Sequence, residues 1–103
     1  MRASVVIAAH NEGPCLWRTV GSCKETAGLL RFEVIVSDDA SNDDSVREMA
    51  VRFPDVRVVG SGRRCGCSPT KDRGAREAQG EVLVFLDGLK RRPNSFRLKP
   101  PLF

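Results

Sequence analysis

Residues 32–45 have the sequence Phe-Glu-Val-Ile-Val-Ser-Asp-Asp-Ala-Ser-Asn-Asp-Asp-Ser. Their first part is typical of a β-strand and their second part is typical of the start of a helix. The first five residues are apolar except for one glutamate, which predicts a short strand inside a sheet. The polar run follows without a gap: Ser41 can cap a helix, and Asp43 and Asp44 suit the positive end of its dipole. The stretch therefore predicts a buried strand that leads through an acidic turn into a helix.

The same order of strand, turn and helix repeats along the chain. Residues 4–9 are β-branched and almost wholly apolar, which is typical of a strand covered on both faces. Apolar residues then recur at helical spacing in two segments, at Leu16, Val20, Cys23, Ala27 and Leu30 and again at Val46, Met49, Ala50 and Phe53. Two more strands are predicted at 56–59 and 81–86, and a third helix at about 69–79, with a face of small residues and Gly80 as its stop.

This alternation through short connections predicts an α/β fold with a mostly parallel sheet and right-handed crossovers. Ligands of such sheets bind beyond the carboxyl ends of the strands. Three of the four predicted ends carry polar or acidic residues, at 9–11, at 38–39 and at Asp87. A ligand site along that edge is therefore expected.

Length and composition exclude several classes of protein. A chain of 103 residues allows one domain, and its 41 % hydrophobic and 29 % charged residues are typical of a globular protein. No apolar run is longer than the five residues of 5–9, which is too short to span a bilayer, and no apolar signal-peptide core precedes Asn11. We therefore expect no transmembrane segment and a cytoplasmic location.

The net charge of +4 comes from the end of the chain. Residues 1–87 hold 12 basic and 13 acidic side chains, whereas residues 88–103 hold five basic and no acidic ones, together with three prolines. This predicts a domain at 1–88 followed by a basic, disordered tail at 89–103, and it argues against a nucleic-acid-binding face. The tail is either an out-of-frame or altered gene-model end, or a genuine arm that binds an acidic partner.

The four cysteines, Cys15, Cys23, Cys65 and Cys67, do not have the spacing of a zinc site. Cys65 and Cys67 are separated by one residue, one fewer than in the usual Cys-x-x-Cys pair, and His10 is the only histidine. We expect unpaired thiols.

The acidic strand ends allow two interpretations. Asp38 and Asp39 either hold a ribose, a base or a divalent metal, or they begin an Asx turn that supports the next helix. Asp87 is either a ligand or a solvated turn acid. Dinucleotide and P-loop folds are excluded, because residues 9–14 contain one glycine and no Gly-Lys-Ser/Thr follows a strand.

Four blocks of the sequence, at 4–12, 32–45, 66–80 and 81–87, together resemble the N-terminal half of a family 2 glycosyltransferase. The resemblance implies an incomplete GT-A fold, a three-layer α/β/α half-domain with a mostly parallel sheet. It also implies a parent activity that transfers a sugar from a nucleotide-diphospho-sugar to an acceptor hydroxyl. One sheet edge would then lack strands of the full domain and leave apolar surface exposed.

The resemblance assigns nucleotide-sugar-binding roles to residues at the strand ends and on the third helix: Ala8, His10, Glu12, Asp38, Asp39, Lys71 and Asp72. It also implies that Asp87 opens an Asp-x-Asp motif, which binds Mg²⁺ or Mn²⁺ against the diphosphate.

Three positions depart from the family pattern. Ala8 stands at the usual proline, Lys71 offers a point charge instead of the planar fork of the common arginine, and Leu89 occupies the third place of Asp-x-Asp. An alkyl chain cannot bind a hard cation. The acceptor half and its general base have no counterpart in the matching blocks, so we expect no catalytic residue and an inactive chain. The alternative is a non-catalytic nucleotide- or partner-binding module with a basic tail.

Overall fold

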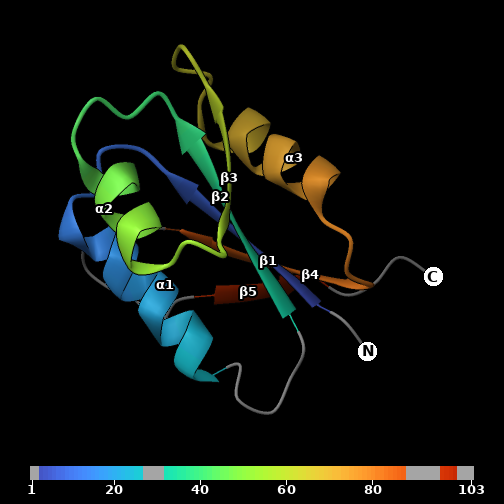
Figure 1. The fold of residues 1–103 in the computed structure, drawn as a ribbon. Coiled ribbons are helices and arrows are strands. Elements are labelled where there is room, and N and C mark those ends of the chain that lie inside the picture. The colour runs from blue at the N-terminus through green and yellow to red at the C-terminus, as the bar shows by residue number, and fades with distance from the viewer. Residues whose placement is uncertain (1–2, 27–31, 88–95, 100–103) are drawn as a thin grey trace.

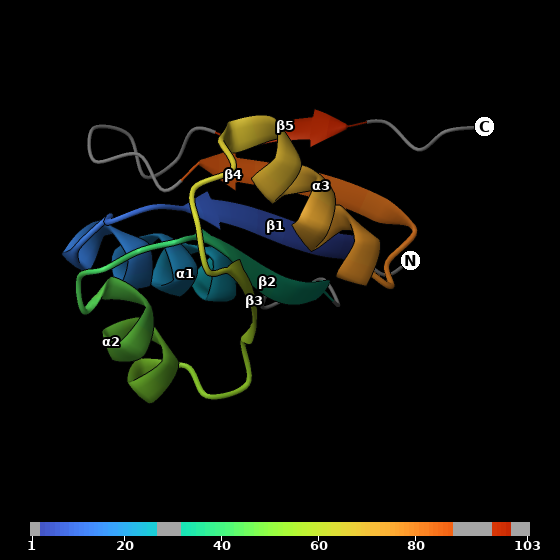
Figure 2. The same ribbon diagram turned by 90° about the horizontal axis from the view of Figure 1, so that it is seen from above.

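The computed structural model describes residues 3–26, 32–87 and 96–99, which form a five-stranded sheet with helices on both faces (Figures 1 and 2). The elements in chain order are β1 (Ala3–Ala9), α1 (Pro14–Thr26), β2 (Phe32–Asp39), α2 (Ser45–Arg52), β3 (Arg57–Ser61), α3 (Cys67–Glu77), β4 (Val82–Asp87) and β5 (Phe96–Lys99). The strands lie in the order β3-β2-β1-β4-β5.

The first four strands are parallel, as the alternation predicts. β1 pairs with both β2 and β4, and β2 pairs with β3, all in the parallel sense. Successive side chains of a strand point to opposite faces of the sheet, so each central strand needs cover on both sides. The α/β prediction and its layered arrangement are confirmed.

The tail prediction is wrong for four residues. Residues 96–99 form β5, which pairs antiparallel with β4. A strand edge presents unpaired N–H and C=O groups, and the backbone of any extended segment can satisfy them without a hydrophobic pattern. The rest of the predicted tail, and the boundary at 88, lie outside the described residues. β4 is not the edge of this sheet.

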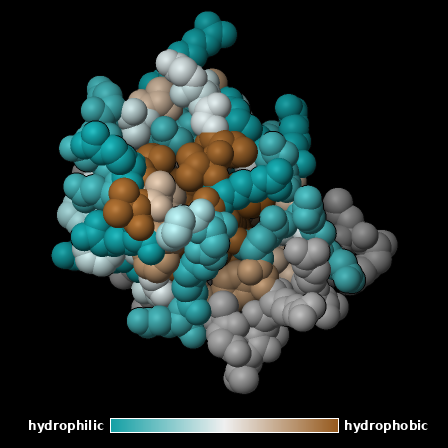
Figure 3. Space-filling model, in the orientation of Figure 1, coloured by the Kyte–Doolittle hydropathy of each residue, from teal (hydrophilic) through white to brown (hydrophobic). Residues whose placement is uncertain are grey.

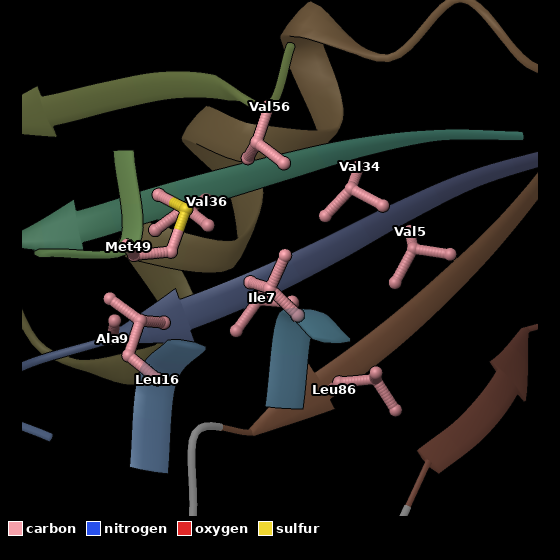
Figure 4. Packing of buried hydrophobic residues seen from close by; sticks show 10 residues of the cluster. Val5, Ile7, Ala9, Leu16, Val34, Val36, Met49, Val56 and Leu86 are labelled. Carbon is pink, nitrogen blue, oxygen red and sulfur yellow. The ribbon is translucent and has the colours of Figure 1, made fainter. Parts of the chain in front are cut away.

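One face of the sheet packs against α1 and α2 (Figure 4). Leu16 and Val20 from α1 and Met49 from α2 are fully buried against Ile7 and Val36 of the sheet. The two predicted helical faces are confirmed at these positions, while Ala27 and Leu30 lie outside the described residues. Burial of this apolar area is the main stabilising contribution on this side.

The Trp17 ring of α1 joins the two helices at the surface. The guanidinium carbon of Arg52 on α2 lies 4.2 Å from the centre of that ring, within the range of a cation–π contact.

α3 covers the opposite face at close range. Gly74 is buried there, and a Cβ atom added to it would lie 2.4 Å from Val6 Cγ1. Thr70, also buried, accepts a hydrogen bond through its carbonyl oxygen from Ser37 Oγ at 2.6 Å. The small-residue face predicted for this helix is therefore what allows its backbone to approach the sheet.

Two helix boundaries differ from the predictions. α2 begins at Ser45, with Asp44 as the residue before it, so Ser41 is not its cap. α3 ends at Glu77, three residues before Gly80, so Gly80 is not its stop.

A partly buried set of hydrogen bonds connects the end of α3 to the start of the sheet. Ser4 Oγ donates to Glu33 Oε2 at 2.6 Å, and the same carboxylate oxygen accepts the Gln79 N–H at 2.6 Å. The Gly80 N–H donates to Ser4 Oγ at 2.8 Å. Ser4 is fully buried, so its hydroxyl satisfies both a carboxylate and a backbone donor away from water.

Ser4→Ala is expected to lower the free energy of unfolding by about 1 kcal/mol, because it leaves the Gly80 N–H without its acceptor. Urea denaturation of the chain measures this change. Ser68→Ala, at an exposed position on α3, is the serine control. Equal stability of Ser4→Ala and the parent chain would show that these hydrogen bonds contribute nothing.

The face of the molecule seen in Figure 3 carries hydrophobic side chains near its middle, surrounded by hydrophilic ones. Within the part of the chain that the structure describes, the exposed large hydrophobic residues are Val51 and Val58. No helix in that same part is both long and apolar enough to cross a membrane.

Candidate functional site

The carboxyl ends of β1, β2 and β4 lie side by side at the same end of the sheet. Ala8 is the register partner of Asp87 on β4, and Ala9 is the partner of Asp38 on β2. Ala8 is partly exposed at this end. The parallel sheet therefore brings three of the polar strand ends together, as the sequence predicts.

His10 is held by the backbone of β2. Its Nδ1 lies 2.6 Å from the Asp39 carbonyl oxygen, and its Nε2 lies 3.3 Å from Asn11 Nδ2. A carbonyl oxygen only accepts, so Nδ1 carries the proton and Nε2 accepts from the amide. Both ring nitrogens are thus engaged within the protein, and the ring fixes the distance between the ends of β1 and β2.

Asn11 supplies the other half of this connection. Its Oδ1 accepts the backbone N–H groups of Asn42 at 2.8 Å and Asp43 at 3.2 Å, which orients Nδ2 toward His10. Its φ of 49° lies in the left-handed region, which asparagine tolerates better than most residues. The residue types at 11–14 predict a turn with Asn11 as a possible helix cap, but not this contact with the segment after β2.

Asp38 supports the turn after β2, which agrees with the second of the two interpretations given for it. Its Oδ1 accepts from Ser41 N at 3.2 Å and from Ser41 Oγ at 2.5 Å, and Ser41 Oγ in turn accepts the Asn11 N–H at 2.9 Å. The carboxylate of Asp38 therefore shapes the turn after β2 instead of capping α2.

Asp39 points to the other face and fastens the loop that precedes α3. Its side chain accepts the N–H of Cys65 at 2.7 Å on Oδ1 and the N–H of Gly66 at 3.0 Å on Oδ2, and Arg64 Nε lies 3.5 Å from Oδ2. The residue is only 4 % exposed. Burial alone would raise the pKa of this carboxyl, but the two backbone N–H groups and the Arg64 charge outweigh it and leave the pKa below its ordinary value.

Gly66 makes this loop geometry possible. Its φ of 94° is a conformation that side chains rarely adopt, and its carbonyl oxygen accepts both the Thr70 N–H at 3.3 Å and Thr70 Oγ1 at 2.6 Å. Asp39 therefore holds the N-terminal end of α3 against the carboxyl end of β2. Cys65 and Gly66 were not predicted as site residues, and only their place between a strand and a helix hinted at a role.

The other predicted residues lie around this connection. Glu12 Oε1 accepts the His10 N–H at 3.4 Å. Lys71 and Asp72 lie on α3 beyond the Asp39-bound loop, Lys71 partly buried and Asp72 exposed. Asp87 ends β4, and its side chain lies outside what the structure describes.

The described residues do not gather a complete set of ligands for a divalent cation. Among residues 3–26, 32–87 and 96–99, no three His, Cys, Asp or Glu side chains gather closely enough to hold a metal ion. Asp87 offers one carboxylate, while Leu89 offers no oxygen ligand at the third place of the expected Asp-x-Asp motif. That Asp87 is a ligand of a divalent metal ion remains a prediction.

All four cysteines are free thiols, as the sequence predicts. Cys67 is exposed, and the other three are partly buried.

Comparison with protein families identifies one match. The sequence model of "Glycosyl transferase family 2" matches residues 4–88. Two curated relatives are each 41 % identical: N-acetylgalactosaminyltransferase 7 from Drosophila melanogaster over 93 residues and polypeptide N-acetylgalactosaminyltransferase 12 from Mus musculus over 92 residues. Each alignment covers 84 % of this chain but 16 % of the relative, so the chain spans about a sixth of their length.

Solved structures agree with the fold. A mannosyltransferase from Pyrobaculum calidifontis, in complex with GDP-Man and Mn²⁺, superposes with a TM-score of 0.73 at 30 % identity, over 84 % of this chain and 27 % of its own. Glucosyl-3-phosphoglycerate synthase from Mycobacterium tuberculosis, in complex with Mn²⁺, UDP and its product, also gives 0.73, at 27 % identity over 89 % of this chain and 36 % of its own. Bound Mn²⁺ in both supports a divalent metal for proteins of this fold.

Proposed function

We propose, since this chain belongs to glycosyl transferase family 2, that it forms the donor-nucleotide-binding part of a glycosyltransferase. The parent activity is transfer of a sugar from a nucleoside-diphosphate sugar to an acceptor hydroxyl. The proposal rests on hydrogen bonds of His10, Asn11 and Asp39. These bonds connect the segments at the carboxyl ends of β1, β2 and β3. That end of the sheet is where ligands of parallel α/β sheets bind.

Asp39 retains capacity for a ligand. Each of its carboxylate oxygens accepts one backbone N–H, and an ionised carboxylate has about four lone-pair sites in all. A base N–H or a ribose hydroxyl can therefore share this carboxylate without breaking the loop contact. His10 and Asn11 act as positioning residues, because their polar side-chain atoms already bind the protein.

Lys71 and Asp72 are proposed to contact the nucleotide from α3, and Ala8 and Glu12 from the end of β1. The Lys71 ammonium would attract the diphosphate as a point charge. Asp87 alone would hold a metal weakly, because a hard divalent cation needs several oxygen ligands.

The 103 residues are expected to transfer no sugar. They include no proposed acceptor site or general base, and Leu89 removes a metal ligand. The measurement incubates the purified chain with UDP and GDP sugars, Mg²⁺ or Mn²⁺ and acceptor peptides or saccharides, and detects product by mass spectrometry. Metal-dependent turnover would overturn this expectation.

Nucleotide binding is the direct test of the proposed site. Calorimetry with UDP and with GDP should detect weak binding that Lys71→Gln reduces and that Arg76→Gln, an exposed cation in the last turn of the same helix, leaves unchanged. Absence of binding to either nucleotide would sink the proposal. Strong binding without transfer, together with a defined protein partner, would favour the non-catalytic module. A cytoplasmic location and the absence of nucleic-acid binding remain predictions.

A further inference from the structure

Cys65 lies in a polar environment between β3 and α3. Its Sγ atom is 3.4 Å from Ser61 Oγ on β3 and 3.6 Å from Arg73 Nη2 on α3. It also lies 3.4 Å from the Arg63 carbonyl oxygen, to which the thiol can donate. The residue is partly exposed, so a small reagent can reach the sulfur.

The groups around this sulfur favour its thiolate form. Hydrogen bonds to the thiolate from the Ser61 hydroxyl and then from the Arg73 guanidinium lower the pKa of the Cys65 thiol, although partial burial and the Asp39 carboxylate oppose them. While the thiol is protonated, the Ser61 hydroxyl donates instead to the Arg63 carbonyl oxygen, 2.8 Å away. Cys23 provides the contrast, because burial raises the pKa of its thiol to about 11. The thiolate is the form that attacks a disulfide.

The Arg73 side chain reinforces this environment. Its Nη2 atom lies 3.6 Å from the sulfur, while its Nη1 atom is buried and has no hydrogen-bond partner among the residues that the structure describes. Arg63 and Arg64, both exposed, flank Cys65 in the sequence. Arg64 already lies against Asp39, while the two cations together favour an anionic reagent over a neutral one.

We propose that Cys65 is a thiol–disulfide exchange site for low-molecular-weight disulfides that carry carboxylates, and that the resulting adduct loosens the contact between Asp39 and the loop before α3. The Cys65 thiolate attacks one sulfur of the disulfide, the S–S bond breaks, and the other half leaves as a thiolate that takes a proton from water. No other oxidant is needed, because the disulfide is reduced as the cysteine is oxidised.

The adduct affects Asp39 through the backbone. Cys65 donates its backbone N–H to Asp39 Oδ1, and Gly66 donates its backbone N–H to Asp39 Oδ2. A bulky group on Sγ would displace Arg73 and Ser61 from the sulfur and shift this short loop. Its effect on nucleotide binding rests on the proposed function, whereas the exchange reaction itself does not.

The probe is glutathione disulfide, incubated with the full chain between pH 5.5 and 8.5, followed by acid quenching and peptide mass spectrometry. Cys65 is expected to carry the first adduct, at least about threefold faster than the exposed Cys67, and dithiothreitol should remove it. Modification of Cys67 at an equal or higher rate, or no adduct at Cys65, would overturn the proposal. Cystamine, a cationic disulfide, should react more slowly with Cys65 than glutathione disulfide does.

Variants test the environment of the sulfur. Arg73→Gln and, independently, Ser61→Ala should each slow the reaction at pH 7 by about threefold and move the midpoint of the rate profile to higher pH. Arg76→Gln on the same helix and Cys67→Ser should leave the Cys65 rate unchanged. Unchanged profiles in both Arg73→Gln and Ser61→Ala would refute the role given to these groups, and Ser61→Ala covers the case in which Arg73→Gln does not fold.

The consequence for the loop is measured separately. Glutathionylated chain should unfold at lower urea concentration than the dithiothreitol-treated chain, and Cys65→Ser treated in the same way should show no shift. An adduct that forms but leaves the urea midpoint unchanged would overturn the proposed coupling to Asp39. Failure of nucleotide binding in the unmodified chain would instead count against the proposed function alone.

Discussion

Gly80→Ala is expected to lower the free energy of unfolding by about 3 kcal/mol, the largest effect of any substitution considered for this chain. A Cβ atom at position 80 would lie 2.6 Å from the carbonyl carbon of Ala3 and 2.7 Å from the backbone nitrogen of Ser4. These are backbone atoms of β1, a strand paired on both sides, so no rotamer change can relieve the contact. Relief would require the segment after α3 to move away and lose the Gly80–Ser4 hydrogen bond.

Gly62→Ala is the matched control for this substitution. Gly62 is exposed, and a Cβ atom there would meet nothing within 4 Å. Its stability should stay within about 0.5 kcal/mol of the parent chain. Urea denaturation of both variants gives the comparison, and a Gly80→Ala variant as stable as Gly62→Ala would show that the two segments are not in contact.

Asp39→Ala is expected to cost about 2 kcal/mol, because it removes the acceptor of two backbone N–H groups at once. Asp39→Asn should cost less, since the amide keeps one oxygen acceptor but sets its NH₂ group against an N–H donor. Asp44→Asn is the control: its carboxylate is 65 % exposed and pairs with Arg47 at the surface, where ion pairs contribute little. Equal stability of the Asp39 and Asp44 variants would contradict the proposed role of Asp39.

The pH dependence gives a second measurement of the same contact. The pKa of the Asp39 carboxyl is lower in the folded chain than its ordinary value, so its ionised form stabilises the fold. That contribution is fully present above the ordinary carboxyl pKa of about 3.9 and is lost as the pH falls through the lower, folded value. The parent chain should therefore lose more stability than Asp39→Ala between neutral and strongly acidic pH. Parallel curves for the two proteins would show that Asp39 is not held as an ion.

Much of the fold could be predicted from local patterns. Runs such as residues 4–9 and 32–36 are too apolar to face water on either side, which indicates central strands of a parallel sheet. Leu16, Val20 and Met49 recur at the helical period and are the residues that the structure buries. The order of strands and helices, the parallel sense and the edge that carries the polar ends all follow from this information.

The site itself was only partly predictable. The sequence placed Asp38 and Asp39 at a strand end but left open whether they bind a ligand or support a turn. The two carboxylates leave opposite faces of β2, and their partners differ for that reason: Asp38 bonds Ser41, three residues away, whereas Asp39 bonds Cys65 and Gly66, 26 and 27 residues away. A local turn can be predicted from neighbouring residues. The contact of Asp39 with Cys65 and Gly66 instead depends on how α3 packs against the sheet.

Periodicity and composition act over a few residues, and they therefore predict the order of the elements from β1 to β4, the parallel pairing and the buried faces of the sheet. Tertiary structure alone decided three features. β5 pairs with β4 through backbone groups that any extended segment offers. Gly80 is required by the closeness of β1, not by the end of a helix. Cys65 acquires its polar surroundings from β3 and α3, since thiol chemistry depends on which charges and donors the packing brings to the sulfur.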